Sequence, residues 1–471
     1  MSPLWTSAEA ESATGGRSSA PWQASGVSID SRTLASDDLF VALNGPRFDG
    51  HDFVADAFAK GAAAALVSRV PPKLESSAPL LTVADTQAAL EALGDASRRR
   101  ATATIIAVTG SVGKTGTKEA LRRAFERQGR SFASAGSLNN QWGVPLSLAR
   151  MPRETAYGVF ELGMNHPGEI DRLSRLVRPD VVVITTIEPV HLGFFASVEA
   201  IADAKAEIFN GMTAKGAAVL NRDNPHFARL AAAARARGLT RILGFGSHAE
   251  AEVRLIDCHL YATASAVTAS VMGEVVDYCV AIPGRHWVMN SLAVVAAVKA
   301  AGGDVAAAAA AMGGIEPMAG RGRRHKLALR GGTVELIDES YNASPASMRA
   351  ALAVLGAIVP ETGGRRIAVL GDMLELGAAS PLLHAELVDP LSEATVDLVF
   401  TVGRDMRTLY EALPQERRGG HAATAEEMAE TLAQRLRPGD VVTVKGSFGS
   451  GMRAVVARLL AGEAAVCPVK G

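Results

Sequence analysis

The sequence predicts an α/β protein of three domains in which mostly parallel sheets are covered by helices. The chain has 471 residues, which is too many for one core at roughly 100–200 residues per domain. From residue 103 onward, short continuous apolar runs alternate with amphipathic runs, as expected for buried parallel strands between helices. A glycine-rich, basic stretch at 313–324 reads as a linker, and the alternation resumes after it in a further unit.

The first domain is predicted to occupy residues 1–102 and to be a small mixed α/β unit. Thr6 is followed three residues later by Glu9, the spacing of a helix capping box, and Gly15 supplies a helix stop. Two strands and a helix are expected next, and then a helix whose basic last turn we expect to be solvated. These features lie at 27–30, 39–43, 54–60 and 98–100.

The central domain is predicted at 103–320, as a phosphate-loop parallel sheet covered by helices with an added β-rich segment. Its apolar runs are continuous, which indicates strands buried on both faces. The expected strands are 104–108, 157–162 and 181–187, the expected helices are 114–128, 167–177, 197–210 and 285–301, and the β-rich segment is 251–282.

The third domain is predicted at 321–471 as a smaller, Rossmann-like unit. Strand and helix patterns again alternate, which is the arrangement of an open parallel sheet. The expected strands are 334–338, 367–370, 398–402 and 441–445.

Composition narrows the class of partner. The formal net charge is −1, with 48% hydrophobic and 21% charged residues, so nothing favours nucleic acid or an anionic membrane surface as the main partner. Cys258, Cys279 and Cys467 are far apart, which predicts no disulfide framework and a reducing compartment. No signal peptide and no apolar run of the ~20 residues needed for a membrane span are found. We therefore expect a cytoplasmic protein, and a monomer.

The sharpest local signal is the segment 107–115, which follows an apolar strand and opens a helix. Its glycines let backbone N–H groups curl around a phosphate, and the helix N-terminus adds a positive dipole end. Lys114 is expected to reach the β- and γ-phosphates of a nucleotide, and the Thr115 hydroxyl to hold Mg²⁺. The loop residues predicted to bind the nucleotide are Thr109, Gly110, Ser111, Val112, Gly113, Lys114 and Thr115.

This match to the general phosphate-loop pattern is imperfect, since Val108 stands where the first glycine is usual. An ordinary strand–turn–helix junction is the plain alternative. Regulatory GTPases, kinases and transport ATPases also use such loops, although the sequence lacks the NKxD-like motif with which a GTPase reads its base. The loop alone therefore predicts a nucleotide and leaves the reaction open.

Three further side chains bear on the reaction. Glu161 ends an apolar strand, and ligands of open α/β sheets gather at the carboxyl ends of strands, so this carboxylate is expected to bind Mg²⁺ near the loop. His191 follows the next buried strand, which we expect to neighbour the strand of Glu161; a purely structural histidine fits equally well. Lys205 lies on a predicted helix, where spacing alone indicates a solvated lysine.

Further short motifs occur in one order along nearly the whole chain. They are Asp30-Ser31-Arg32, Gly50-His51-Asp52-Phe53, Asn139-Asn140 with Gly143 and Pro145, Glu161-Leu162-Gly163-Met164-Asn165, Ala204-Lys205-Ala206-Glu207, Pro283-Gly284-Arg285-His286 with Asn290, Ser340-Tyr341-Asn342, the segment 371–377, and Val444-Lys445-Gly446-Ser447. Together with the phosphate loop, this set resembles the Mur ligase family, whose members build the peptide of bacterial cell-wall precursors. The segments 340–342 and 371–377 are most similar to the members that add D-alanyl-D-alanine to UDP-N-acetylmuramoyl-tripeptide.

The resemblance implies an ATP-dependent ligase that activates a carboxylate as an acyl phosphate and joins it to an amine. It also implies that Lys205 is carbamylated by CO₂ and so becomes an anionic ligand for Mg²⁺. The implied catalytic residues are Lys114, Glu161, His191 and Lys205, and the implied metal ligands are Thr115, Glu161, His191 and carbamylated Lys205. The implied ATP contacts beyond the loop are Asn290 to adenine, Asp338 to ribose and Arg321 to the phosphates. The resemblance further implies that the first domain binds the UDP end of the substrate and that the third domain binds the amine substrate. The implied substrate-binding residues are Ser31, Arg32, Asn139, Asn140, Asn342 and Ser344.

The sequence departs from the family pattern at two positions. Gly193 stands where an acidic residue is common, and Phe448 stands where arginine is usual. Two sibling activities stay open: a ligase that adds a single amino acid, and a folate polyglutamate ligase. The Asp-Asn-Pro-Arg motif of the diaminopimelate-adding sibling is absent from the last domain. A nucleotide-binding module without catalysis and a scaffold protein are the alternatives from other classes.

Overall fold

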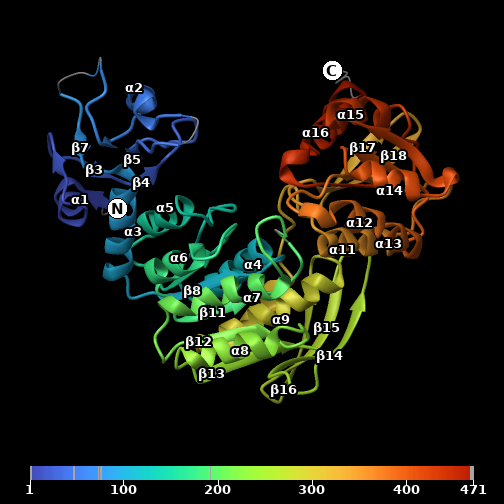
Figure 1. Ribbon diagram of the computed structural model, residues 1–471, viewed down its shortest axis with the longest axis horizontal. Coiled ribbons are helices and arrows are strands. Elements are labelled where there is room, and N and C mark those ends of the chain that lie inside the picture. The colour runs from blue at the N-terminus through green and yellow to red at the C-terminus, as the bar shows by residue number, and fades with distance from the viewer. Residues whose placement is uncertain (1–2, 46–47, 73, 75–76, 191, 467–471) are drawn as a thin grey trace.

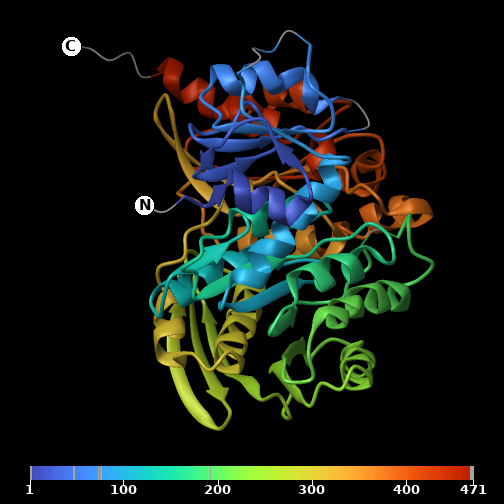
Figure 2. The ribbon, with the colours of Figure 1, turned by 90° about the vertical axis from the view of Figure 1, so that its left-hand side faces the viewer.

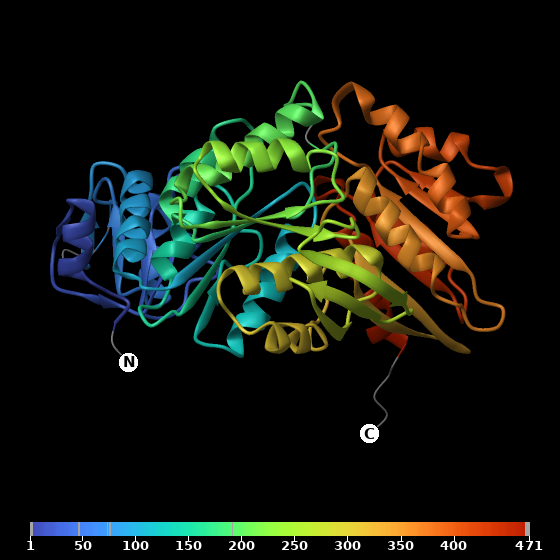
Figure 3. The ribbon, with the colours of Figure 1, turned by 90° about the horizontal axis from the view of Figure 1, so that it is seen from below.

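The computed structural model describes residues 3–45, 48–72, 74, 77–190 and 192–466. Three sheet-based units follow one another along the chain, with the N-terminal and C-terminal units at opposite ends of the central one (Figures 1 and 3). Both outer units rise from the same side of the central unit (Figures 1 and 2). The predicted α/β fold class is confirmed, while the positions of the domain boundaries stay predictions.

The N-terminal unit contains a five-stranded sheet of order β2-β7-β6-β5-β4, parallel except at β2, and a two-stranded ladder of β1 with β3. The predicted capping box is present at α1, since the Glu9 amide donates to the Thr6 hydroxyl and the Thr6 amide donates to the Glu9 carboxylate. The strands are β1 (Trp5–Thr6), β2 (Arg17–Ser18), β3 (Gln23–Ala24), β4 (Gly26–Ser28), β5 (Asp38–Val41), β6 (Ala64–Val67) and β7 (Leu80–Thr82), and the helices are α1 (Ser7–Thr14), α2 (Val54–Ala59) and α3 (Thr86–Arg100).

The central unit contains a nine-stranded sheet of order β16-β15-β14-β13-β12-β11-β8-β10-β9. Pairing is parallel from β9 through β14 and antiparallel from β14 to β16, the β-rich segment that the sequence predicts. The strands are β8 (Thr104–Thr109), β9 (Ser131–Ala133), β10 (Tyr157–Glu161), β11 (Val181–Ile184), β12 (Ala217–Asn221), β13 (Arg241–Gly246), β14 (Val253–Leu260), β15 (Ser265–Val271) and β16 (Glu274–Val280).

Helices cover both faces of this sheet because successive strand residues point to opposite sides. Ile106 and Val108 of β8 pack with one set of helices, and Ile105 and Ala107 pack with the other. The first set is α4 (Lys114–Glu126), α9 (Arg285–Ala300) and α10 (Val305–Met312), and the second is α5 (Gly143–Arg150), α6 (Glu169–Val177), α7 (Val198–Ala206) and α8 (Phe227–Ala236).

The C-terminal unit contains a six-stranded sheet of order β17-β18-β22-β19-β20-β21, parallel except at β17. Its strands are β17 (Arg323–Leu329), β18 (Gly332–Glu339), β19 (Arg366–Gly371), β20 (Leu398–Val402), β21 (Arg418–Ala422) and β22 (Val441–Lys445). Its helices are α11 (Pro345–Gly356), α12 (Ser380–Ala385), α13 (Val388–Glu393), α14 (Met406–Ala412), α15 (Ala425–Ala433) and α16 (Arg453–Val466). Among the described helices, none combines the length and apolar character needed to cross a bilayer.

Three expectations about local structure are wrong. The predicted linker 313–324 already contains the start of β17, an edge strand whose arginines resemble a loop in the sequence. The strand predicted at 181–187 ends at Ile184, because the following residues turn to hydrogen-bond the loop after β8. The basic end of α3 is not simply solvated, since the Arg98 guanidinium donates to the carbonyls of Val177 and Arg178 at 2.8 and 3.0 Å.

Candidate active site

Three strand ends meet at one edge of the central sheet. Strand β8 lies between β10 and β11, in parallel register with both, so Glu161 is level with Val108 and Ile184 is level with Thr109. The expectation that β11 neighbours the strand of Glu161 is therefore wrong, because β8 separates them. The loop after β8 is consequently flanked on one side by the end of β10 and on the other by the end of β11.

The phosphate loop is tied to the segment that follows β11. The Ser111 amide donates to the Thr186 carbonyl at 2.8 Å, and the Ser111 hydroxyl donates to the Glu188 carbonyl at 3.1 Å. The Thr185 hydroxyl donates to the Val112 carbonyl at 2.5 Å. These bonds use carbonyl groups of the loop and of the neighbouring segment, and they fix the loop before any ligand binds.

Two glycines of the loop are required by close approaches. Gly110 has φ +145°, and a Cβ there would be 1.9 Å from the Thr185 Oγ1 atom. Gly113 has φ +84°, and a Cβ there would be 2.8 Å from the Asn290 Oδ1 atom of α9. Asn290, predicted from the resemblance to contact adenine, therefore lies directly against the loop.

Lys114 folds back over the loop. Its ammonium donates to the Gly110 and Ser111 carbonyls at 2.7 and 3.2 Å. Burial lowers the pKa of the Lys114 ammonium; the nearby Glu161 carboxylate acts in the opposite direction, and the Arg321 guanidinium adds to the lowering. Lys114 is thus close enough to Glu161 and to Arg321 to be influenced by both charges.

Glu161 has one carboxylate oxygen that no described residue contacts by a hydrogen bond. The residue is 1% exposed, and its Oε1 atom accepts a hydrogen bond from the Asn139 amide at 2.7 Å. Among the described residues, no donor reaches its buried Oε2 atom, which is costly for a carboxylate unless a ligand completes it. Thr115, also buried, adds a hydroxyl in the first turn of α4. Mg²⁺ binds oxygen ligands such as carboxylates and hydroxyl groups, so Glu161 and Thr115 fit the predicted ion.

Lys205 is buried, contrary to the solvated position that spacing alone indicates. It is 2% exposed at the end of α7. Burial lowers its pKa well below the usual range, and the charge of Lys114 lowers it further. A neutral amine is the form that reacts with CO₂. His191 lies outside the described residues.

The predicted residues Arg321 and Asp338 lie where the central and C-terminal units meet. The Cζ atom of Arg321 is 4.2 Å from the centre of the Tyr341 ring, and the Tyr341 hydroxyl hydrogen-bonds to Ser137 of the central unit. Asp338 accepts from the Gly320 amide at 2.8 Å and the Ser340 hydroxyl at 2.6 Å. Its carboxylate therefore holds the segment that leads to Arg321.

Both departures from the family pattern lie at this junction as well. The Gly193 amide donates to the Glu375 carbonyl of the C-terminal unit at 3.1 Å. Phe448 has the guanidinium of Arg453 at 4.7 Å from its ring centre.

Three other predicted residues have local structural partners. The Asn140 side chain accepts from the Gly143 amide at 2.9 Å at the start of α5, and Ser344 forms a capping box with Ser347 at the start of α11. Asn342 accepts from its own neighbour, the Ala343 amide, at 2.9 Å. Their substrate-binding roles stay predictions.

The two substrate residues predicted in the first domain differ in exposure. Ser31 is buried, and its carbonyl accepts from Lys60 at 2.9 Å. The exposed Arg32 pairs with Asp30 at 2.7 Å. Their contact with the UDP end of a substrate stays a prediction.

Lys118 is a residue of the site that the sequence reasoning missed. Its side chain is fully buried, and its ammonium donates to the carbonyls of Ser134 and Gly136 and pairs with Glu119 at 3.0 Å. The segment that it holds leads directly to Asn139, the partner of Glu161. The only sequence signal is its position one helical turn after Lys114, which by itself indicates a solvated lysine.

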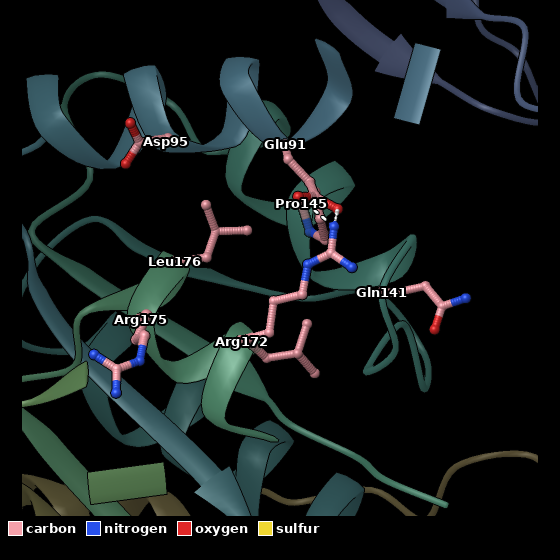
Figure 4. Close-up of a pocket in the computed structure, with 8 residues that line it drawn as sticks. Glu91, Asp95, Gln141, Pro145, Arg172, Arg175 and Leu176 are labelled. Atoms are coloured by element: carbon pink, nitrogen blue, oxygen red, sulfur yellow. Dashed lines mark hydrogen bonds and ion pairs between the residues drawn. The ribbon is translucent and has the colours of Figure 1, made fainter. Parts of the chain in front are cut away.

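A separate pocket of about 250 Å³ lies between α3, α5 and α6 (Figure 4). Arg172 and Glu91 form an ion pair of 2.6 Å across it. None of the predicted site residues lines this pocket, and we assign it no role in the site.

A phosphate loop at the carboxyl edge of a parallel sheet, with a Rossmann-like unit beside it, defines a nucleotide-dependent α/β protein. Three family descriptions match the chain: "Mur ligase family, catalytic domain" over residues 23–100, "Mur ligase middle domain" over 108–298, and "Mur ligase, glutamate ligase domain" over 320–448. The chain belongs to the Mur ligase family, whose members are ATP-dependent ligases that form amide bonds.

Relatives and a solved structure agree over nearly the whole length. The UDP-N-acetylmuramoyl-tripeptide--D-alanyl-D-alanine ligase of Escherichia coli (strain K12) is 35% identical over 92% of this chain and 93% of that protein. The ligase of the same name from Rickettsia prowazekii is 33% identical over 90% of this chain and 92% of that protein. The crystal structure of MurF from Acinetobacter baumannii is 31% identical, with a TM-score of 0.83 and coverage of 97% of this chain and 99% of that chain.

The loop geometry predicts the effect of Gly113→Ala. The new Cβ would require an unfavourable φ of +84° and would meet Asn290 at 2.8 Å. We expect ATP to bind about tenfold more weakly or worse, since a left-handed residue alone costs about 1–2 kcal/mol. Isothermal titration calorimetry with ATP measures this.

Gly15→Ala is the matched control. Gly15 has φ +68° at the end of α1, but nothing lies within 4 Å of its Cβ position. It should lose a similar amount of stability and leave ATP affinity unchanged. Wild-type ATP affinity in Gly113→Ala would show that this loop does not hold the nucleotide.

Proposed function

We propose that this protein joins D-alanyl-D-alanine to UDP-N-acetylmuramoyl-tripeptide with the cleavage of ATP, during synthesis of peptidoglycan precursors in the cytoplasm. The reaction class is supported by one observation above the others: Lys114, Glu161 and Lys205 gather around a pre-formed phosphate loop. The choice of substrates is supported by the names of relatives that match this chain over most of its length.

The chemistry requires activation because the oxygen of a carboxylate is a poor leaving group. Transfer of the γ-phosphoryl group of ATP to the tripeptide carboxylate converts that oxygen into a phosphate leaving group. The amine of D-alanyl-D-alanine then attacks the carbonyl carbon of this acyl phosphate, and inorganic phosphate leaves as the amide forms. For phosphoryl transfer, the protein mainly has to position the reacting groups and stabilise the charge of the transition state.

In this proposal, the loop amides and Lys114 hold the phosphates of ATP. The ammonium now bonded to the Gly110 and Ser111 carbonyls would turn to the β- and γ-phosphates. Arg321 would add charge from the junction, Asn290 would contact adenine and Asp338 the ribose. Ser31, Arg32, Asn139, Asn140, Asn342 and Ser344 are proposed to contact the two other substrates.

Mg²⁺ is proposed to be held by Thr115, Glu161, His191 and the carbamate of Lys205. When bound, the ion would neutralise charge on the phosphates. The unpartnered Oε2 atom of Glu161 supports this assignment.

An amine panel tests the proposed substrates. Purified protein is given ATP, magnesium and UDP-N-acetylmuramoyl-tripeptide with D-alanyl-D-alanine, L-glutamate or meso-diaminopimelate, and both phosphate release and product mass are followed. We expect amide formation with the dipeptide. Amide formation with a free amino acid but not the dipeptide would contradict the proposed substrate.

A second prediction concerns Lys205→Ala. Loss of a residue that only orients a metal ligand costs up to about a hundredfold. Loss of the carbamate, a direct ligand in this proposal, should therefore reduce turnover by more than about a hundredfold. Added formate or acetate should restore part of the turnover, because the added anion would occupy the space of the lost carbamate. Carbon-13 NMR with labelled bicarbonate should show a carbamate signal in the wild-type protein only.

Lys215→Ala serves as the control, because Lys215 is exposed in the turn before β12. It should leave turnover and the carbamate signal unchanged. An unaffected rate in Lys205→Ala would remove the carbamate from the proposal.

A further inference from the structure

Two guanidinium groups lie near one aromatic ring where the central and C-terminal units meet. The Cζ atoms of Arg321 and Arg453 are 4.2 and 5.0 Å from the centre of the Tyr341 ring. Arg453 begins α16, and its Cζ atom is also 4.7 Å from the centre of the Phe448 ring. Cation–π contacts hold each guanidinium in place, but two like charges near one ring repel each other. An anion beside both would remove that repulsion.

No acidic partner accompanies either guanidinium among the ion pairs of the described residues. By contrast, Arg458, on the same helix as Arg453, contacts Glu430 at 2.6 Å. Arg453 and Arg321 are therefore held by aromatic contacts and still have their donor groups available.

The surrounding charge is also positive. The Arg321 guanidinium contributes to lowering the pKa of both Lys114 and Lys445, so these cations are close together. Lys445 is already neutralised in part by Glu339 at 3.3 Å. Arg321 is therefore close to two ammonium groups, of which Lys114 has the Glu161 carboxylate nearby and Lys445 has that of Glu339.

Tyr341 connects this group to the phosphate loop. Its hydroxyl hydrogen-bonds to Ser137, two residues before Asn139, whose amide holds Glu161 at 2.7 Å. The ring that positions the two guanidinium groups is therefore anchored to the segment that positions the carboxylate of the site.

We propose that Arg453 and Arg321 form an anion clamp over Tyr341 that binds an oxyanion of a substrate. A guanidinium fork matches the oxygen atoms of both phosphate and carboxylate. The oxyanion is either a phosphate of ATP or the carboxylate of D-alanyl-D-alanine, and the second choice rests on the proposed function. Arg453 is the new member of the site.

Arg453→Gln and Arg453→Lys in the full-length protein test the clamp. Glutamine removes the charge, and lysine retains the charge without the fork. Arg458→Gln is the matched control, since it removes an arginine from the same helix that is paired with Glu430. ATP affinity is measured by calorimetry, and KM is measured for D-alanyl-D-alanine and for its C-terminal amide.

If the clamp binds a phosphate, Arg453→Gln should weaken ATP binding about tenfold, the loss of one charge-assisted pair. If it binds the carboxylate, the same variant should raise KM for D-alanyl-D-alanine about tenfold and leave the amide unchanged. Arg453→Lys should fall between wild type and glutamine, and Arg458→Gln should match wild type.

Unchanged ATP affinity together with unchanged KM for both dipeptides would overturn the clamp. Failure of the proposed function can be told apart from failure of the clamp, because it would appear as absent amide formation in the wild-type protein. Without amide formation, the clamp is tested by ATP affinity only, and equal affinity in wild type and Arg453→Gln would overturn it.

Discussion

The parallel pairing of β8 with β10 on one side and β11 on the other is the constraint on which the candidate site depends. This register brings Glu161 and the phosphate loop to one edge, and it lets the segment after β11 hold the loop through Thr185 and Ser111. A slip of one residue would turn the buried side chains of a strand to the opposite face. Because helices cover both faces, the hydrophobic cores on either side of the sheet fix the strand register. The same packing therefore holds Glu161 and the phosphate loop in their relative positions.

Buried charges distinguish structural from chemical roles in this site. Lys118 has carbonyl and carboxylate partners, so its charge is satisfied and it holds the segment before Asn139. Lys205 is equally buried, but its main electrostatic neighbour is another cation, Lys114. Burying a charge is tolerated only when partners compensate for it, and Lys118 has such partners. Burial and the charge of Lys114 lower the pKa of Lys205 and so favour the neutral amine that can react.

Local signals were predictable from the sequence, and long-range ones were not. The phosphate loop and the capping box of Thr6 with Glu9 depend on a few consecutive residues, and the structure has both elements where the sequence predicts them. The insertion of β8 between β10 and β11 depends on the order of strands in space, which periodicity does not encode. The burial of Lys118 and Lys205 depends on neighbouring elements far along the chain, so a helical lysine pattern indicates solvent exposure for both. Lys205 is predicted as a site residue from the family resemblance and not from the helical pattern.

In the proposed reaction, the phosphate loop presents ATP to a peptide carboxylate, so that phosphate leaves carrying one carboxylate oxygen. The most direct measurement uses UDP-N-acetylmuramoyl-tripeptide labelled with oxygen-18 in the carboxylate that becomes the new amide, followed by mass spectrometry of the released phosphate. An acyl phosphate route should place one labelled oxygen in each phosphate released during amide formation. Amide formation with unlabelled phosphate would contradict it, because the carboxylate would then have been activated by another route.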